Sequence, residues 1–88
     1  MLKVGSVVML DLDIKEKVMI IGRLMKMTEE DGAIWDYCGC IIPQGLQNPE
    51  QIRLFNHKDI RGLLFIGYKD EEELGYSLEL SEEKEKHN

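Results

Sequence analysis

Two short segments of the chain gather the side chains that could do chemistry. The first holds a carboxylate, a phenol and two thiols, and the second holds an amide, an imidazole and another carboxylate. They read Asp36-Tyr37-Cys38-Gly39-Cys40 and Phe55-Asn56-His57-Lys58-Asp59-Ile60. Such a combination has three interpretations: a metal site, a thiol nucleophile activated by a histidine, or structural residues of a small binding domain.

The metal interpretation depends on Cys38, Cys40 and His57. Zinc needs three or four protein ligands, commonly with Cys-x-x-Cys or His-x-x-x-His spacing. Here the cysteines have Cys-x-Cys spacing, and the second imidazole of the chain, His87, stands next to the C-terminus. The spacing therefore does not favour metal binding, and we expect neither a metal nor a cofactor.

The enzyme interpretation makes Cys38 or Cys40 a nucleophile and His57 its base. Asp36 or Asp59 would orient the histidine, and an oxyanion site would also be needed. A small-molecule pocket is hard to build in 88 residues that must also supply a core. Buried thiols on a strand and a histidine just after a helix cap explain the same residues structurally. We therefore expect no catalytic residue and no enzyme activity.

Three bulky residues, Trp35, Tyr37 and Ile41, fall on one face of an expected strand. Core packing is the default explanation for such a stripe. Aromatic side chains are also the preferred anchors of protein interfaces. An exposed aromatic residue in so small a chain would indicate a binding surface.

The elements that position these residues are mostly strands. We expect them at residues 6–12, 18–27, 33–42, 51–55 and 63–66. Gly22, in the middle of the second strand, predicts a bulge or sharp bend. Simple alternation along that strand places Ile20 and Arg23 on opposite faces. Asp31-Gly32 predicts a hairpin turn within the loop 28–32.

Two helical segments are also expected. Asn56 can cap a single turn, with Asp59 returning a bond as in a capping box. The Glu and Lys content of residues 70–86, with an acidic first turn, favours a helix. Against this, the apolar residues from Leu74 to Leu80 alternate with period two, and Gly75 costs a helix about 1 kcal/mol. We predict an α+β fold: a small, mainly antiparallel β-sheet or partly closed β-barrel of about five strands, with one short helical turn and a C-terminal helix.

Composition and charge restrict the function classes. The chain forms one domain, 1–88, with a β-rich body over 1–68 and an acidic tail over 69–88. The tail holds eight acidic and three basic residues of a chain whose net charge is −6. No basic stripe is available for phosphates, which argues against nucleic-acid binding. No apolar run could span a membrane and no signal peptide is recognisable, so we expect a cytoplasmic protein with reduced thiols and no membrane partner.

The chain resembles a family of small uncharacterised-domain proteins of Gram-positive bacteria, encoded in type VII secretion gene clusters beside LXG toxins. The resemblance is carried by segments that run in order through residues 5–72. They are Gly5-Ser6-Val7-Val8, Met19-Ile20-Ile21-Gly22-Arg23, Asp36-Tyr37-x-Gly39-Cys40, Pro43-x-Gly45, Leu54-Phe55-Asn56-His57-x-Asp59-Ile60 and Gly67-Tyr68-x-Asp70-Glu71-Glu72. The family pattern usually has Tyr where this chain has Trp35, which is a swap between aromatic residues.

The resemblance implies a cytoplasmic, non-enzymatic accessory protein, similar to a chaperone that binds an LXG toxin before export. The residues we associate with partner binding are Trp35, Tyr37, Phe55, Asn56, His57 and Tyr68. A second possible function is an immunity-type inhibitor of a toxin domain, because an acidic inhibitor suits the basic site of a nuclease. A small thiol or metal enzyme is a third, and a barrel-type nucleic-acid binder, which the charge disfavours, is a fourth.

Overall fold

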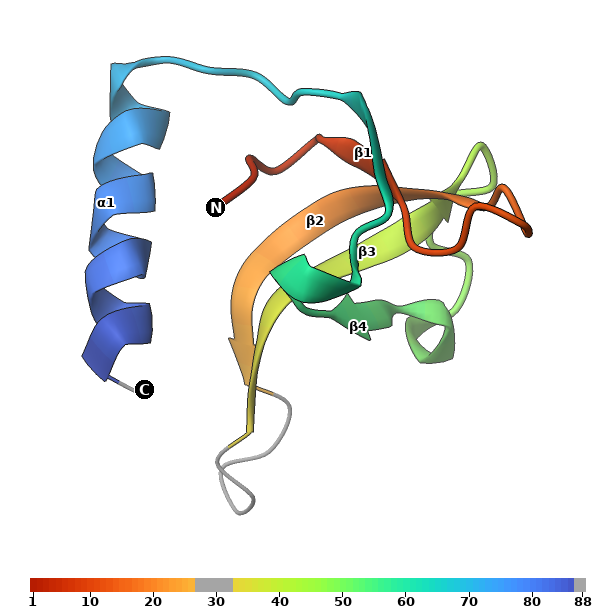
Figure 1. Cartoon of the computed structure of the whole chain (residues 1–88), viewed down its shortest axis with the longest axis horizontal. Coiled ribbons are helices and arrows are strands. Elements are labelled where there is room, and N and C mark those ends of the chain that lie inside the picture. The colour runs from red at the N-terminus through yellow and green to blue at the C-terminus, as the bar shows by residue number, and fades with distance from the viewer. Residues whose placement is uncertain (27–32, 87–88) are drawn as a thin grey trace.

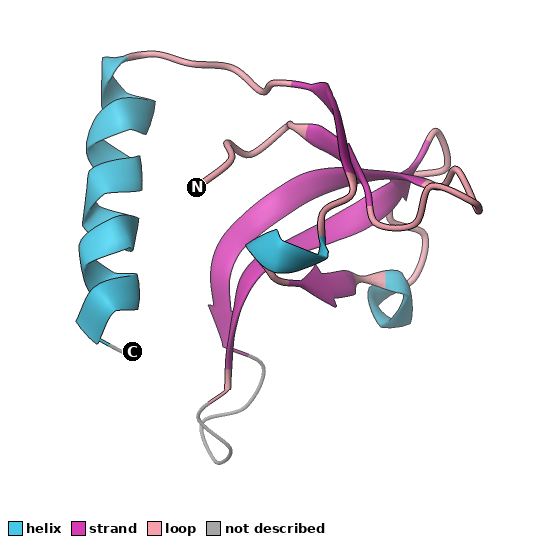
Figure 2. Ribbon diagram, in the orientation of Figure 1, coloured by secondary structure: helices cyan, strands magenta, loops and turns pink. Residues whose placement is uncertain are grey.

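In the part of the chain that the structure describes, five strands and one long helix make up the framework (Figures 1 and 2). The computed structural model describes residues 1–26 and 33–86, so the predicted hairpin turn within 28–32 lies outside the described residues. The strands are β1 (Val7–Met9), β2 (Lys17–Lys26), β3 (Ile34–Ile42), β4 (Arg53–Phe55) and β5 (Gly62–Phe65), and the helix is α1 (Glu71–Lys86). Two 3₁₀ turns, Pro49–Gln51 and His57–Asp59, flank β4. The predicted α+β class is confirmed.

The strands form one antiparallel sheet in the order β4-β3-β2-β1-β5. β4 and β5 end this order on opposite sides, so the described strands make an open sheet rather than a partly closed barrel. The chain therefore crosses from one edge of the sheet to the other between β4 and β5. Figure 1 shows β2 and β3 as long, curved strands with α1 standing beside them.

Two of the expected strands are shorter than predicted because a turn replaces one end. β1 stops at Met9, since the Asp11 carboxylate accepts a hydrogen bond from the Asp13 N–H and turns the chain. β4 starts at Arg53, since Asn48 caps the preceding 3₁₀ turn through its side-chain oxygen. Asp, Asn and Pro favour such turns because their local hydrogen bonds or fixed φ compete with the strand ladder.

β2 contains the bulge that Gly22 predicts, and the bulge changes which residues share a face. Ile20 pairs with Gly39 and Arg23 pairs with Tyr37, with the register shifting between Ile20 and Gly22. Directly opposed residues of an antiparallel pair share a face, so Ile20 and Arg23 lie on the same face. The prediction that separated them is wrong, because one extra residue reverses the alternation beyond the bulge.

The core lies on this shared face of the sheet. Its buried members are Val8, Val18, Ile20, Tyr37 and Phe55, with Met1, Leu2, Leu10 and Ile60 packed against them. A Cβ atom at Gly39 would lie 2.6 Å from Val18 Cγ1 and 2.7 Å from the Met19 carbonyl oxygen. Glycine is therefore required there for β2 and β3 to approach each other with Val18 in the core.

α1 begins as the sequence predicts. The Asp70 carboxylate accepts a 2.8 Å hydrogen bond from the Glu73 N–H, and residues 71–73 place three further carboxylates in the first turn. Negative charge is favourable there because it faces the positive end of the helix dipole. The period-two pattern of residues 74–80 therefore does not form a strand. Leu80 is the buried residue of this helix.

Candidate functional site

Tyr37 and His57 meet at the centre of the two segments that carry chemical groups. Tyr37 stands on β3, directly opposite Phe55 of β4, and His57 begins the 3₁₀ turn after β4. The Tyr37 hydroxyl and His57 Nδ1 share a 2.8 Å hydrogen bond, and the Leu2 N–H donates to the same hydroxyl at 2.8 Å. These bonds satisfy the polar end of a side chain that is otherwise enclosed in the core.

Asp36 joins the same two segments through its backbone and its carboxylate. Its N–H donates to Asn56 Oδ1 at 3.1 Å, and its carboxylate accepts from the His57 N–H at 2.9 Å. The second carboxylate oxygen lies 2.9 Å from Lys84 Nζ on α1. Burial by itself raises the pKa of Asp36, but the His57 N–H and the Lys84 ammonium outweigh it and leave the pKa lowered.

The capping box predicted after β4 is present. The Asp59 carboxylate accepts a 2.8 Å hydrogen bond from the Asn56 N–H, and the turn His57–Asp59 follows. Asn56 is thus held by Asp59 on its own turn and by Asp36 on the neighbouring strand. The polar residues of the two segments therefore bond mainly to one another.

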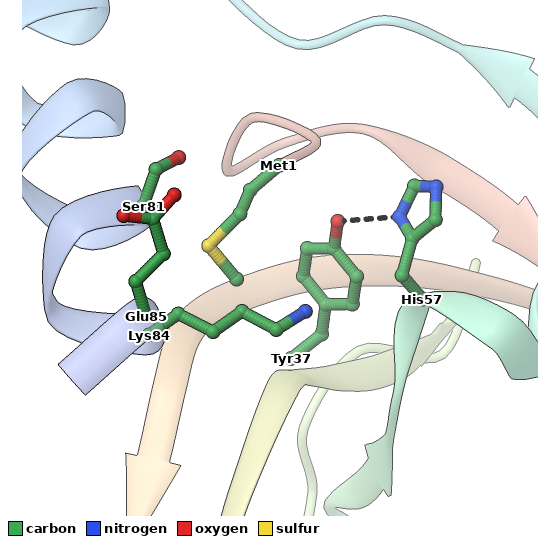
Figure 3. A pocket seen from close by; sticks show the side chains of 6 residues that line it. All are labelled: Met1, Tyr37, His57, Ser81, Lys84 and Glu85. Carbon is green, nitrogen blue, oxygen red and sulfur yellow. Dashed lines mark hydrogen bonds between the residues drawn. The ribbon is translucent and has the colours of Figure 1, made fainter. Parts of the chain in front are cut away.

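A cleft of about 340 Å³ lies between this network and the second half of α1 (Figure 3). The side chains that line it are Met1, Tyr37, His57, Ser81, Lys84 and Glu85. Burial raises the pKa of Tyr37, so its hydroxyl stays protonated at neutral pH. The cleft combines one apolar side chain with hydroxyl, imidazole, ammonium and carboxylate groups. Such a lining suits a ligand that has both polar and apolar groups.

The two cysteines are buried on β3 and form no disulfide bond. Burial, with a smaller contribution from Cys40, raises the pKa of the Cys38 thiol and disfavours its thiolate. Within residues 1–26 and 33–86, no three His, Cys, Asp or Glu side chains are grouped to hold a metal ion. His57 instead bonds to Tyr37.

Arg23 has a role that the sequence analysis missed. Its Nη1 lies 2.7 Å from Glu73 Oε1 and 2.9 Å from Ser77 Oγ, and its guanidinium lies 5.1 Å from the ring centroid of Tyr76. Burial would raise the pKa of Glu73, but the Ser77 hydroxyl and the Arg23 guanidinium lower it. The sequence did contain a signal for this buried ion pair, because Arg23 is the single arginine within the apolar run of β2.

β5 presents an apolar surface at the edge of the sheet. Four consecutive side chains are exposed: Leu63 (47%), Leu64 (52%), Phe65 (61%) and Ile66 (57%). Tyr68, two residues further on, is 78% exposed. On its inner side β5 pairs with β1, and the register skips Leu64. Contiguous exposed apolar residues on an edge strand are typical of a protein-binding surface.

The structure places the six residues associated with partner binding in different environments. Tyr37 and Phe55 are buried in the core, where their rings lie 5.4 Å apart. Trp35 and Asn56 are partly buried, whereas His57 and Tyr68 are exposed. Tyr68 was predicted from the sequence as a binding residue, but residues 63–66 were not, because an apolar run in a short strand does not reveal whether anything covers it.

The fold and these surfaces define a small α+β protein with an open sheet and an exposed apolar edge. A model of the family described as "Domain of unknown function (DUF4176)" matches residues 1–76, and the chain belongs to this family. No curated protein and no solved structure matches the chain. Among the described residues, no helix is long and apolar enough to cross a membrane.

Proposed function

We propose that this protein is a non-enzymatic, cytoplasmic accessory factor that binds another protein. Its partner is an LXG-type toxin exported by the type VII secretion system, which it keeps stable before export. The toxin as partner is inferred from the sequence resemblance described above. The observation that supports protein binding is the exposed apolar edge formed by β5 and the residues that follow it, Leu63–Ile66 and Tyr68.

The mode of binding that suits this edge is strand addition. An edge strand has backbone N–H and C=O groups available on one side, and a partner strand can pair with them while its side chains contact the apolar residues. β5 supplies four residues, which is longer than the three of β4 at the opposite edge. The bulge at Leu64 and the short length of β5 limit uncontrolled self-association, as in many natural edge strands.

Co-expression with an LXG toxin tests this proposal. The tagged protein should co-purify with the toxin, and the Leu63→Lys/Phe65→Lys variant should lose most of the complex. The matched control is Leu46→Lys/Ile14→Lys, whose side chains are 47% and 68% exposed and belong to loops outside the strands. A wild-type protein that retains no toxin would refute the proposed partner.

The backbone contribution can be separated from the side chains. Leu64→Pro removes the N–H of the residue that the β1–β5 register skips. If circular dichroism shows that the sheet is retained, this variant should weaken strand addition at β5. Leu64→Ala serves as its control, because it removes the same side chain but keeps the N–H. Equal toxin binding by both variants would exclude strand addition at β5.

An immunity-type inhibitor is the second candidate, and the acidic tail supports it. Segment 69–88 carries eight acidic and three basic residues, which would complement the basic active site of a nuclease toxin. The two functions differ in the segment bound. An inhibitor binds the C-terminal toxic domain and abolishes its activity, whereas a chaperone leaves that activity intact. A toxin truncated before its toxic domain should therefore bind a chaperone and escape an inhibitor.

A further inference from the structure

The side of α1 that faces the sheet is mostly polar. Glu73 and Ser77 bond to Arg23, and Lys84 pairs with Asp36. Leu80 is the one buried residue among the described part of the helix. A helix that packs on a core usually turns an apolar stripe inward and leaves its polar face to water. α1 instead contacts the sheet through charged and hydroxyl groups. Some of its leucines are therefore left outside the core.

Two leucines of α1 are exposed to solvent rather than packed in the core. Leu74 is 48% exposed and Leu78 is 68% exposed. Helical spacing places them on the same side of α1 as Ser81 and Glu85. Ser81 and Glu85 line the cleft opposite Tyr37 and His57, as Figure 3 shows. We call Leu74, Leu78 and this cleft the α1 groove.

The charges beside the α1 groove are predominantly negative. Glu71 precedes Leu74 by three residues, Glu82 follows Leu78 by four, and Glu85 lines the cleft itself. Helix neighbours at these spacings lie next to each other on the surface, so carboxylates border the leucine stripe. Lys84, the lysine that lines the cleft, is engaged with Asp36. A ligand that covers the leucines therefore meets an acidic border.

We propose that the α1 groove docks an amphipathic helix whose apolar stripe is bordered by lysine and arginine. This inference rests on the proposed function, because the docked helix belongs to the protein partner. A helix laid along α1 can bury the two leucines and place its cations against the carboxylates. A second copy of this chain is disfavoured, because it would bring two acidic helices together. α1 has 16 residues and is about 24 Å long, so a partner helix of similar length would match it.

A defined peptide tests the α1 groove independently of any toxin. The probe is a fluorescent helical peptide of about 16 residues, the length of α1, with leucines on one face and lysines elsewhere. A second peptide replaces each lysine by glutamate. The wild-type protein should bind the lysine peptide in an anisotropy titration. Leu74→Gln/Leu78→Gln should weaken that binding at least about tenfold, because both apolar contacts are lost.

The control variant for this titration is Leu46→Gln/Ile14→Gln. Its side chains are 47% and 68% exposed, nearly the same as those of Leu74 and Leu78, but they lie outside α1. It should bind the lysine peptide as the wild type does. Leu74→Ala/Leu78→Ala, which keeps a high helix propensity, replaces the glutamine variant if circular dichroism shows loss of helix. Equal binding by the α1 variants and the control, or equal binding of the glutamate peptide, would overturn the proposal.

The toxin experiment separates this inference from the proposed function. If the toxin co-purifies equally with the wild type and the α1 variant, the protein-binding function stands and the α1 groove is refuted as its docking site. If the toxin does not co-purify with the wild type, the proposed partner is refuted, and the peptide titration alone decides whether the α1 groove binds a basic helix. Loss of toxin only in the α1 variant supports both.

Discussion

Arg23 and Glu73 join the sheet to the helix through a buried ion pair. Their side chains are 3% and 13% exposed, and Arg23 Nη1 lies 2.7 Å from Glu73 Oε1. Arg23 Nε and Glu73 Oε2, both buried, have no hydrogen-bond partner among the described residues. Buried polar atoms without partners offset much of the attraction between the charges. The pair therefore fixes where α1 lies more than it raises the net stability of the fold.

Removing one partner of this pair should be costly. Arg23→Ala leaves Glu73 buried without its counter-charge, and we expect the free energy of unfolding to fall by about 3 kcal/mol. Glu73→Ala should show a similar loss, because it leaves the arginine unpaired. The double variant should lose clearly less than the two single losses together. Urea denaturation followed by circular dichroism measures all three, and strictly additive losses would contradict the coupling.

The lowered pKa values of Asp36 and Glu73 predict a loss of stability in acid. A carboxylate whose pKa is lower in the folded state binds fewer protons there than in the unfolded state. Its contribution is therefore complete above the ordinary values of 3.8 for Asp36 and 4.5 for Glu73. It is lost as the pH falls below those values. The free energy of unfolding, measured by urea titration at several pH values, should be level near neutrality and fall in that acidic range.

Asn and Gln variants provide the control for the acid profile. Asp36→Asn and Glu73→Gln cannot titrate, so the double variant should be less stable at neutral pH and should lose less further stability on acidification. A double variant with the same slope in acid as the wild type would show that different carboxylates cause the loss.

Replacing Gly39 and Gly75 by alanine should change the stability of the fold in opposite directions. At Gly39 a Cβ atom would meet Val18 Cγ1 and the Met19 carbonyl oxygen at 2.6 and 2.7 Å, so Gly39→Ala must displace backbone and should destabilise the fold by about 2 kcal/mol. At Gly75 in α1, a Cβ atom meets nothing within 4 Å. Gly75→Ala should therefore stabilise the protein by about 0.5 to 1 kcal/mol through helix propensity. Thermal unfolding of both variants measures the contrast; a loss of stability in Gly75→Ala would contradict it.

The burial of both cysteines allows the thiol-enzyme hypothesis to be tested. Because Cys38 and Cys40 are buried and burial raises the pKa of Cys38, the native protein should react slowly with a thiol reagent, and the urea-unfolded protein should react quickly. Combined replacement of both cysteines by Ser should leave partner binding intact if the variant folds, because both thiols are buried. Loss of partner binding in a folded variant would reopen a functional role for these groups.

Much of the local structure follows from the sequence alone. Gly22 indicates the bulge, Asn56 and Asp59 indicate the capped turn, and Asp70 with the acidic residues after it indicates the start of α1. These signals depend on backbone freedom, capping and helix dipoles, which involve residues only a few positions apart. The sequence is sufficient wherever the deciding interaction is that short in range.

Tertiary structure alone decided the features that matter for a binding surface. Arg23 shares a face with Tyr37 because the bulge reverses the alternation, and Glu73 reaches it from 50 residues away. Tyr37 is buried because Phe55 of β4 and the N-terminal segment enclose it, whereas Phe65 is exposed because β5 ends the sheet. The local sequence around an aromatic or apolar residue looks the same whether that residue is buried in the core or exposed at the sheet edge. Its exposure depends on strand order and on the placement of α1, which arise from contacts between segments far apart in the chain.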